Sequence, residues 1–293
     1  MNRKRTDLAL EARELWRESA GETTRLPGIR AREHHSRGIL TTVVEVLNQE
    51  GVRALQKPEG IYVTLELAPG LLRQPSGFGR AAVRLGREVA RLLPENGSVL
   101  VVGLGNGAVT PDAIGPRCLE HLVVTRHLGG QLPQLRPVSA MAPGVLGTTG
   151  MESAEVVRGL VEKTGPACVV VVDALASRSV DRLCTAIQLT DTGITPGSGV
   201  GNRRAAFDRR SLGVPVVAVG VPTVVQAATL LADALEENGR PQNKQTISCG
   251  PELIVTTKDV DAQVETMARL LGYGLSMGLH RGLGLEEIGC LIG

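Results

Sequence analysis

Two aspartates in this sequence follow apolar runs, a placement that suits paired carboxylates acting on a water molecule. Asp173 directly follows the run CVVVV at 168–172, and Asp112 follows the run VLVV at 99–102 after a glycine-rich loop. Such runs indicate strands buried on both faces of a parallel sheet, and ligands bind beyond the carboxyl ends of those strands. Two carboxylates that meet there share a proton, which raises one pKa and leaves the other low, as acid/base catalysis requires.

Each aspartate also has a purely structural interpretation. The sequence VTPDAIGP predicts a helix that starts at Pro111 with Thr110 as its N-cap. Asp112 would then complement the helix dipole, a contribution of about 0.3–1 kcal/mol. Asp173 at a strand end would cap a loop. Only the pair, and neither residue alone, points to catalysis.

The glycine-rich loop leaves a second function open, that of an NADP-dependent oxidoreductase. Gly103, Gly105 and Ala108 in GLGNGA fit a loose G-x-G-x-x-G/A pattern. Arg126 follows the strand-like run LVVT at 122–125, where such an enzyme holds a 2′-phosphate. The proline that follows the motif lacks an N–H and moves the helix start away from the glycines, which disfavours this alternative.

A second glycine-rich loop, DTGITPGSGVGNRR at 191–204, is a candidate for substrate binding. Ser198 stands between two glycines, but G-x-S-x-G is not met and no histidine stands in a triad context. The backbone N–H groups of this loop are suited to hold a carbonyl or an anion. Arg203 and Arg204 are suited to hold an acidic side chain bidentately, and the structural alternative is a solvated basic loop.

The composition argues against several classes of protein. The 293 residues include 32 Lys+Arg against 30 Asp+Glu, with two Phe, two Tyr and one Trp, which disfavours a nucleic-acid surface. There is no apolar run of about 18 residues, and acids interrupt the basic N-terminus, so neither a membrane span nor a signal peptide is expected. The five cysteines are dispersed, without CxxC or HExxH spacing, which predicts reduced thiols in a cytosolic compartment and no metal site.

The elements that must position these residues alternate between strand and helix. Strands are expected at 39–47, 61–67, 99–102, 168–172 and 214–219. Helices are expected over the first sixteen residues, at 80–93, after Thr149 with Glu152 completing a capping box, at about 223–237 and at about 259–279. This alternation predicts an α/β fold, a largely parallel or mixed sheet with helices on both faces. Residues 238–247 are the most polar loop and the one expected to be flexible.

Several long segments, in order, carry a family likeness. They are RTDLALEARELW, EGIYVTLEL, VVGLGNGAVTPDAIGP, MAPGVLGTTGMES, VVVVDALASR, IQLTDTGITPGSGVGNRR and VGVPTVV. From about Arg5 to Val225, and more weakly near the end, the chain resembles the spore germination protease of endospore-forming bacteria. The fold of that family is similar to the fold of hydrogenase-maturation proteases, which implies the same α/β class.

The resemblance implies an endopeptidase that initiates the degradation of small acid-soluble spore proteins during germination, in the cytoplasm of the forespore or spore core. It implies a homotetramer made as a zymogen that processes itself, with no cofactor, no membrane and no direct nucleic-acid partner. It assigns the catalytic carboxylates to Asp112 and Asp173. The chain looks short for the family, and the loop around 238–247 is where we expect the missing length.

The resemblance also implies a cut after Glu or Asp and before a hydrophobic residue that is followed by Ala. Asp7-Leu8-Ala9 fits this rule, which predicts a propeptide of residues 1–7 and a single peptidase domain over 8–293. The family prefers an acid four positions before the cut, where this chain has Lys4. That departure would slow self-processing or require another enzyme.

Within this reading we expect Asp112 to be the ionised base, because a helix N-terminus favours its anion. Asp173 is expected to be protonated and to polarise the scissile carbonyl, although a coupled pair titrates as a pair. Candidate N–H donors for the oxyanion lie in the first glycine loop, at Gly103, Gly105 and Asn106. A non-catalytic relative remains an alternative, as does a hydrolase in which the carboxylates hold a divalent ion.

Overall fold

A single mixed sheet organises the chain. The structure, a computed structural model, describes residues 5–20, 26–200, 204–237 and 253–292. The described strands form a nine-stranded sheet in the order β1-β2-β3-β7-β8-β6-β4-β5, with β9 paired to β8. In chain order they are β1 (Ile29–Ser36), β2 (Ile39–Val46), β3 (Gly60–Leu67), β4 (Val99–Gly103), β5 (Val138–Met141), β6 (Cys168–Ser177), β7 (Ala186–Thr190), β8 (Val216–Gln226) and β9 (Ile254–Val255).

The sheet has a parallel half and an antiparallel half. β5, β4, β6 and β8 run parallel to one another, whereas β1, β2, β3 and β7 pair antiparallel and join the parallel half through β7 and β8. The continuous apolar runs at 99–102 and 168–172 lie in β4 and β6, which are buried on both faces, as parallel strands usually are. The expected α/β class with a mixed sheet is confirmed.

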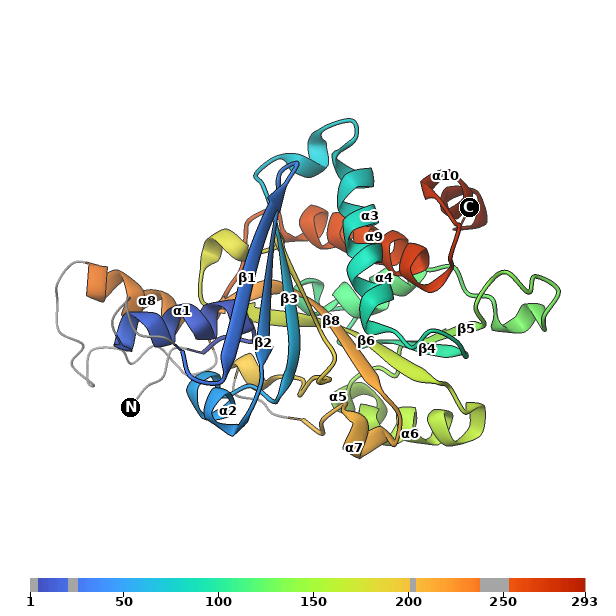
Figure 1. The fold of residues 1–293 in the computed structure, drawn as a ribbon, viewed down its shortest axis with the longest axis horizontal. Coiled ribbons are helices and arrows are strands. Elements are labelled where there is room, and N and C mark those ends of the chain that lie inside the picture. The colour runs from blue at the N-terminus through green and yellow to red at the C-terminus, as the bar shows by residue number, and fades with distance from the viewer. Residues whose placement is uncertain (1–4, 21–25, 201–203, 238–252, 293) are drawn as a thin grey trace.

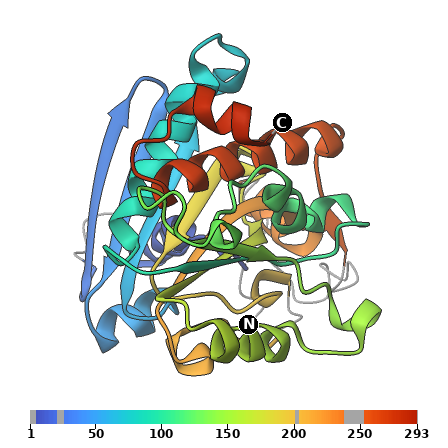
Figure 2. The same ribbon diagram turned by 90° about the vertical axis from the view of Figure 1, so that its right-hand side faces the viewer.

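Helices cover both faces of the sheet (Figures 1 and 2). They are α1 (Ala9–Ala20), α2 (Gln49–Leu55), α3 (Gly77–Leu92), α4 (Ile114–Glu120), α5 (Leu146–Thr149), α6 (Ser153–Thr164), α7 (Arg209–Leu212), α8 (Ala227–Glu237), α9 (Val260–Leu279) and α10 (Leu285–Ile292). α3, α4 and α9 pack on one face and share the largest apolar core with the strands. Among the described helices, none is long and apolar enough to span a membrane.

The opposite face of the sheet carries two separate apolar clusters. One is formed by β4 and β6 with α6 and α7. The other is formed by β2 and β3 with α1 and α2, and includes Tyr62 and Trp16. Between the two clusters the strands present polar side chains to this face, those of Gln188 in β7 and Asp173 in β6, both buried. The polar gap in an otherwise apolar face marks where to look for a site.

Besides those at Asp112 and Asp173, four predictions about local structure are wrong. The N-terminal helix starts at Ala9 because the Asp7 N–H bonds to the Ala176 carbonyl, outside any helix. The run LVVT at 122–125 is not a strand, since the Val123 N–H bonds to Ser276 Oγ on α9. Residues 223–226 continue β8 instead of starting a helix.

The fourth concerns α6, whose N-cap is Glu152 without any side-chain capping bond, so the Thr149 capping box does not form. Thr149 Oγ1 bonds instead to the Val145 and Met151 carbonyls. The loop expected near 238–247 lies outside the described residues. The division into residues 1–7 and 8–293 stays a prediction.

Candidate active site

The neighbouring parallel strands β4 and β6 bring the two aspartates together. β4 ends at Gly103, which pairs with Val172, so Asp173 lies just beyond the end of its neighbour. Asp173 was expected to follow its strand, but β6 continues to Ser177 and Asp173 lies within it. The charge of Asp112 acts on Asp173 directly and raises its pKa, so the two carboxylates share one electrostatic environment. The two aspartates that the sequence singled out therefore lie near each other beyond the end of β4, and their catalytic role stays a prediction.

The glycine loop after β4 holds Asp112 in place. The Asn106 N–H donates to Asp112 Oδ2 at 2.7 Å, and the Asp112 N–H donates to the Val109 carbonyl at 2.8 Å. Gly105 has φ +108°, and a Cβ there would lie 1.9 Å from the Asp112 carbonyl oxygen. Only glycine allows this approach. The loop is thus built around the carboxylate.

Asp112 lies in a short 3-10 turn, Thr110–Asp112, and not in the first turn of an α-helix, which starts only at Ile114. The expected N-cap role of Thr110 is wrong, because its hydroxyl donates to Asp261 Oδ1 at 2.6 Å on α9. On the other side of the turn, Thr223 Oγ1 donates to the Pro111 carbonyl at 2.6 Å. The turn is therefore tied to both α9 and β8, and the position of Asp112 depends on three separate elements.

Burial raises the pKa of both aspartates, but to different degrees. The pKa of Asp112 is raised by burial, an effect opposed by the Asn106 N–H. The pKa of Asp173 is raised well above its usual range, by burial first and then by the charges of Asp112 and Asp7. The Ala174 N–H, which donates to Asp173 Oδ1 at 2.9 Å, opposes the shift only partly. The pKa of Asp173 is therefore raised more than that of Asp112, so Asp173 keeps its proton more strongly.

The expectation that a helix dipole lowers the pKa of Asp112 is thus wrong in its cause. When the pKa values of two acids are separated in this way, the acid whose pKa rises less ionises first. What makes Asp112 the easier group to ionise is its lesser burial and the Asn106 N–H on its carboxylate.

Of the N–H groups expected to bind an oxyanion in the glycine loop, that of Asn106 already donates to Asp112; Gly103 and Gly105 stay predictions. The Leu104 N–H donates to the Val172 carbonyl at 2.8 Å, and the Asn106 N–H is bonded to Asp112. The space above Gly103 is filled as well, because a Cβ there would lie 2.4 Å from the Gly115 carbonyl oxygen. A dinucleotide loop needs free N–H groups that face a pyrophosphate, so this arrangement disfavours the NADP alternative.

A row of residues across three strands connects the aspartates to the antiparallel half of the sheet. Gln188 in β7 pairs with Gly220 in β8, and Gly220 pairs with Asp173 in β6. Residues opposite one another point to the same face, so Gln188 and Asp173 flank a strand position that has no side chain. At a strand spacing of about 4.8 Å, their Cα atoms are about 10 Å apart. The Leu175 side chain covers Gly220 between them, since a Cβ at Gly220 would lie 2.5 Å from Leu175 Cγ.

A segment of the chain itself, Thr6–Leu8, lies beside this row. The Asp7 N–H donates to the Ala176 carbonyl at 2.9 Å, and the Ala176 N–H donates to Asp7 Oδ2 at 2.9 Å. Ser198 Oγ donates to Asp7 Oδ1 at 2.8 Å. Ser198 thus contacts the first residue of the predicted cleavage pair, while Arg203 lies outside the described residues.

The Asp7 carbonyl oxygen is held by two side chains that the sequence did not single out. Lys57 Nζ donates to it at 2.9 Å, and Gln188 Nε2 donates to it at 3.0 Å. Burial lowers the pKa of Lys57, against the charges of Asp7 and Glu11. A signal for Gln188 existed, since it is the amide in the buried run AIQLT, but Lys57 lies in an ordinary polar loop and only the fold reveals it.

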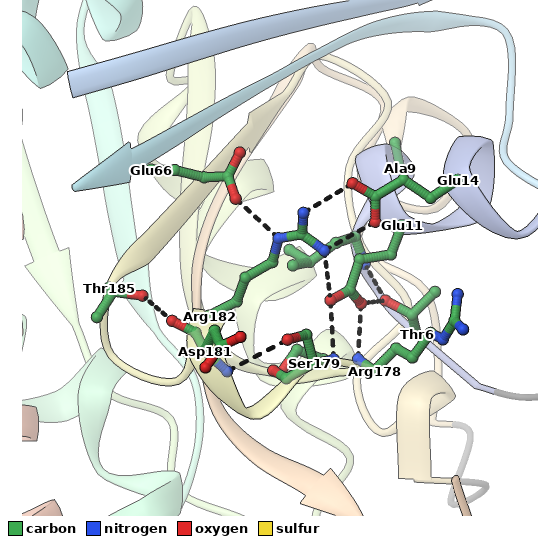
Figure 3. Close-up of polar contacts among 12 residues, drawn as sticks. Thr6, Ala9, Glu11, Glu14, Glu66, Arg178, Ser179, Asp181, Arg182 and Thr185 are labelled. Atoms are coloured by element: carbon green, nitrogen blue, oxygen red, sulfur yellow. Dashed lines mark hydrogen bonds and ion pairs between the residues drawn. The ribbon is translucent and has the colours of Figure 1, made fainter. Parts of the chain in front are cut away.

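The helix that follows this segment is fixed by an arginine network (Figure 3). Glu11 is fully buried and accepts from the Arg178 N–H at 2.6 Å, the Ser179 N–H at 3.1 Å and the Thr6 hydroxyl. Arg182 pairs with Glu11 at 3.1 Å, and it also pairs with Glu14 and Glu66. α1 is thereby locked onto the turn that follows β6, which fixes where residues 6–8 enter the site.

Comparison with known proteins gives consistent matches. A family model described as Germination protease matches residues 9–241. The germination protease of Caldanaerobacter subterraneus subsp. tengcongensis is 42% identical over 98% of both chains. Those of Clostridium tetani and Bacillus cytotoxicus are 38% and 35% identical, each over 97% of this chain and over 98% and 96% of their own. The crystal structure of the NiFe hydrogenase maturation protease HycI from Thermococcus kodakarensis KOD1 aligns with a TM-score of 0.35 and 16% identity, covering 64% of this chain and 98% of that chain.

Proposed function

This chain belongs to the germination protease family and is therefore a peptidase; on that premise we propose that it is an endopeptidase in which Asp112 and Asp173 act together on a water molecule. The observation that carries the proposal is the proximity of two carboxylates, buried Asp173 within β6 and half-buried Asp112 in the turn that follows the neighbouring strand β4, where the charge of Asp112 raises the pKa of Asp173. That arrangement keeps one acid protonated and one ionised, which is what hydrolysis of an amide by paired carboxylates needs.

In the proposed reaction Asp112 takes a proton from water while the water oxygen bonds to the scissile carbonyl carbon. The carbonyl π electrons move to the oxygen, which accepts a hydrogen bond from protonated Asp173. The tetrahedral intermediate collapses as the C–N bond breaks. The departing nitrogen takes the proton that Asp112 had accepted, so the dyad returns to its starting protonation. The different pKa shifts of the two acids support this division of roles.

We propose that the substrates are small acid-soluble spore proteins, cut after Glu or Asp during germination in the spore core. The same preference makes Asp7–Leu8 the self-processing bond of a zymogen, and a homotetramer is the proposed assembly. The location of residues 6–8 beside Asp173 supports self-processing, because Asp7 is close enough for its charge to raise the pKa of Asp173. Lys4, at the position where an acid is preferred, lies outside the described residues.

The test is intact-mass spectrometry of a small acid-soluble spore protein incubated with protein that begins at Leu8. Every variant is prepared in this form, so that retention of residues 1–7 cannot account for a loss of cutting. A single internal cut after an acidic residue, absent with Asp173→Asn and present with the exposed control Asp181→Asn, is the expected result. Substantial cutting by Asp173→Asn would refute the aspartate pair.

Two further controls address the alternatives. Loss of activity with a chelator would replace the metal-free reaction with a metal-dependent one. Binding of NADP, with no proteolysis by any form, would favour the oxidoreductase.

A further inference from the structure

The contacts of Asp7 form a complete set for one amino-acid residue, which is unusual for a segment that merely crosses a surface. Its N–H, its carbonyl oxygen and both oxygens of its carboxylate each have partners from other parts of the chain. Those partners come from the loop before β3, from β6, from β7 and from the 191–200 loop. A residue whose every polar atom has a hydrogen-bond partner is bound in the way that a ligand is bound in its site.

The carboxylate of Asp7 lies in a cradle that a methyl group would fill. Ser198 Oγ and the Ala176 N–H donate to its two oxygens, so each has a donor of its own. A Cβ at Gly199 would lie 2.2 Å from Asp7 Oδ2 and 2.8 Å from the Ala176 Cβ. The cradle is thus built for a carboxylate, with one hydroxyl donor, one backbone donor and a glycine wall.

The carbonyl of Asp7 has the partners that a developing oxyanion needs. Lys57 Nζ and Gln188 Nε2 both donate to its oxygen, at 2.9 and 3.0 Å. Gln188 is itself oriented, because its Oε1 accepts from the Ala9 N–H at 2.7 Å. Asp173 lies across Gly220 from Gln188 on the same face. An oxyanion has three lone pairs, so Lys57 and Gln188 supply two of the donors it can accept and leave one lone pair for the Asp173 proton of the proposed reaction.

We infer that Lys57 and Gln188 bind the scissile carbonyl, and that Ser198, the Ala176 N–H and the space at Gly199 form the subsite for the acidic residue before the cut. This rests on the proposed function, and it extends that function to residues for which the aspartate pair gives no role. Asp7 occupies the subsite in the full chain, so a protein substrate enters only after residues 1–7 leave. The subsite then receives the Glu or Asp of that substrate.

The experiment follows self-processing of the full chain by intact mass over time. Lys57→Met keeps the length of the side chain and removes its charge, and it should slow the cut by about 100-fold, the effect of losing an oxyanion donor. Gln188→Met should slow it by about tenfold. Lys163→Met, a change of the same kind on the exposed side of α6, should leave the rate unchanged. A wild-type rate for Lys57→Met would overturn the carbonyl assignment.

The carboxylate subsite is tested by combining each substitution with Asp7→Ala, which removes the carboxylate that the subsite binds. Ser198→Ala should slow the cut by about tenfold, as loss of a hydrogen bond to a charged group does. In an Asp7→Ala background Ser198→Ala should have no further effect, whereas Lys57→Met should still slow the cut. A merely structural role for Ser198 predicts the same slowing in both backgrounds, and that result would overturn the subsite. Gly199→Ala should behave as Ser198→Ala does.

A second readout separates failure of this inference from failure of the proposed function. If the wild-type chain never cuts itself, self-processing is disproved, and amide hydrogen exchange of Asp7 is measured in the Asp173→Asn protein. Faster exchange after Ser198→Ala and Lys57→Met supports the binding set. Unchanged exchange overturns it, with or without proteolysis.

Discussion

Two buried carboxylates on the same side of the molecule are treated in opposite ways. Glu11 is fully buried and receives two backbone N–H groups, a hydroxyl and the Arg182 guanidinium. Asp173, only 5% exposed, receives one backbone N–H, and within the described part of the chain no lysine or arginine pairs with it. Instead, the nearby charges that act on its pKa come from two other carboxylates.

The difference shows how burial alone says little about what an acid does. A buried charge that is fully paired is costly to disturb and holds the fold together. A buried acid left without a cation keeps its proton, which makes it available for chemistry. The Glu11 network therefore fixes α1 and the entry of residues 6–8, and the unpaired Asp173 remains reactive at the point where that segment arrives.

The largest expected effect comes from removing the general base proposed to act with Asp173, the carboxylate of Asp112. Asp112→Asn should lower the rate of proteolysis by about 10²–10⁴-fold, the usual contribution of a general base. The fold should survive, because asparagine can still accept the Asn106 N–H. Cleavage kinetics together with the circular dichroism spectrum check this. A folded Asp112→Asn protein with normal activity would show that the aspartate pair, like Glu11, has no role in the reaction.

The next largest effect is on stability, and it belongs to the paired acid. Arg182→Met leaves Glu11 buried without its cation, and should lower the free energy of unfolding by about 3–5 kcal/mol. It should not alter the reaction itself in the fraction that remains folded. Urea denaturation measures the loss, with the exposed Arg126→Met as a control. A change below 1 kcal/mol would mean that the network is not what locks α1.

A smaller effect is the dependence of protein stability on pH that comes from Asp173. The pKa of Asp173 is raised on folding, so the folded state binds its proton more tightly than the unfolded state. Its contribution is unfavourable above the unfolded pKa of about 4, and stability is lost as pH rises towards the folded pKa. Asp173→Asn should therefore raise Tm by a few degrees at pH 7 and by much less near pH 4.

Thermal unfolding at the two pH values checks this prediction. Arg182→Met serves as the opposite case, since it should lower Tm at neutral pH. A lower Tm for Asp173→Asn at pH 7 would show that the ionised carboxylate is stabilised by contacts beyond the Ala174 N–H.

The smallest expected effect concerns the tie that orients the catalytic turn. Thr110→Val removes the exposed hydroxyl bond to Asp261 and should change the free energy of unfolding by less than about 1 kcal/mol. Proteolysis should slow by only a fewfold, because Thr223 still holds the Pro111 carbonyl. Peptidase assays on Thr110→Val, on Thr223→Val and on the double variant check it. Equal loss from Thr110→Val and Asp112→Asn would contradict this ranking.

Much of the architecture was readable from apolar patterning. The runs at 99–102 and 168–172 predicted buried strands, which is confirmed, and the aspartates after them were expected at one sheet edge for that reason. β1 was missed because its sequence, IRAREHHS, is charged and mostly exposed. An edge strand needs no apolar alternation, since part of its surface stays in water.

Residue patterns predicted the α/β class and the family resemblance predicted peptidase activity, and both are confirmed; the catalytic role of the paired aspartates and the cleavage rule stay predictions. Those depend on local patterns of residue type and on order along the chain. Only the tertiary structure decided that Lys57, Gln188 and Ser198 surround Asp7, because these groups lie 50 to 191 positions away from it in the chain. Contacts of that range are set by strand register and loop packing, which no local window of sequence contains.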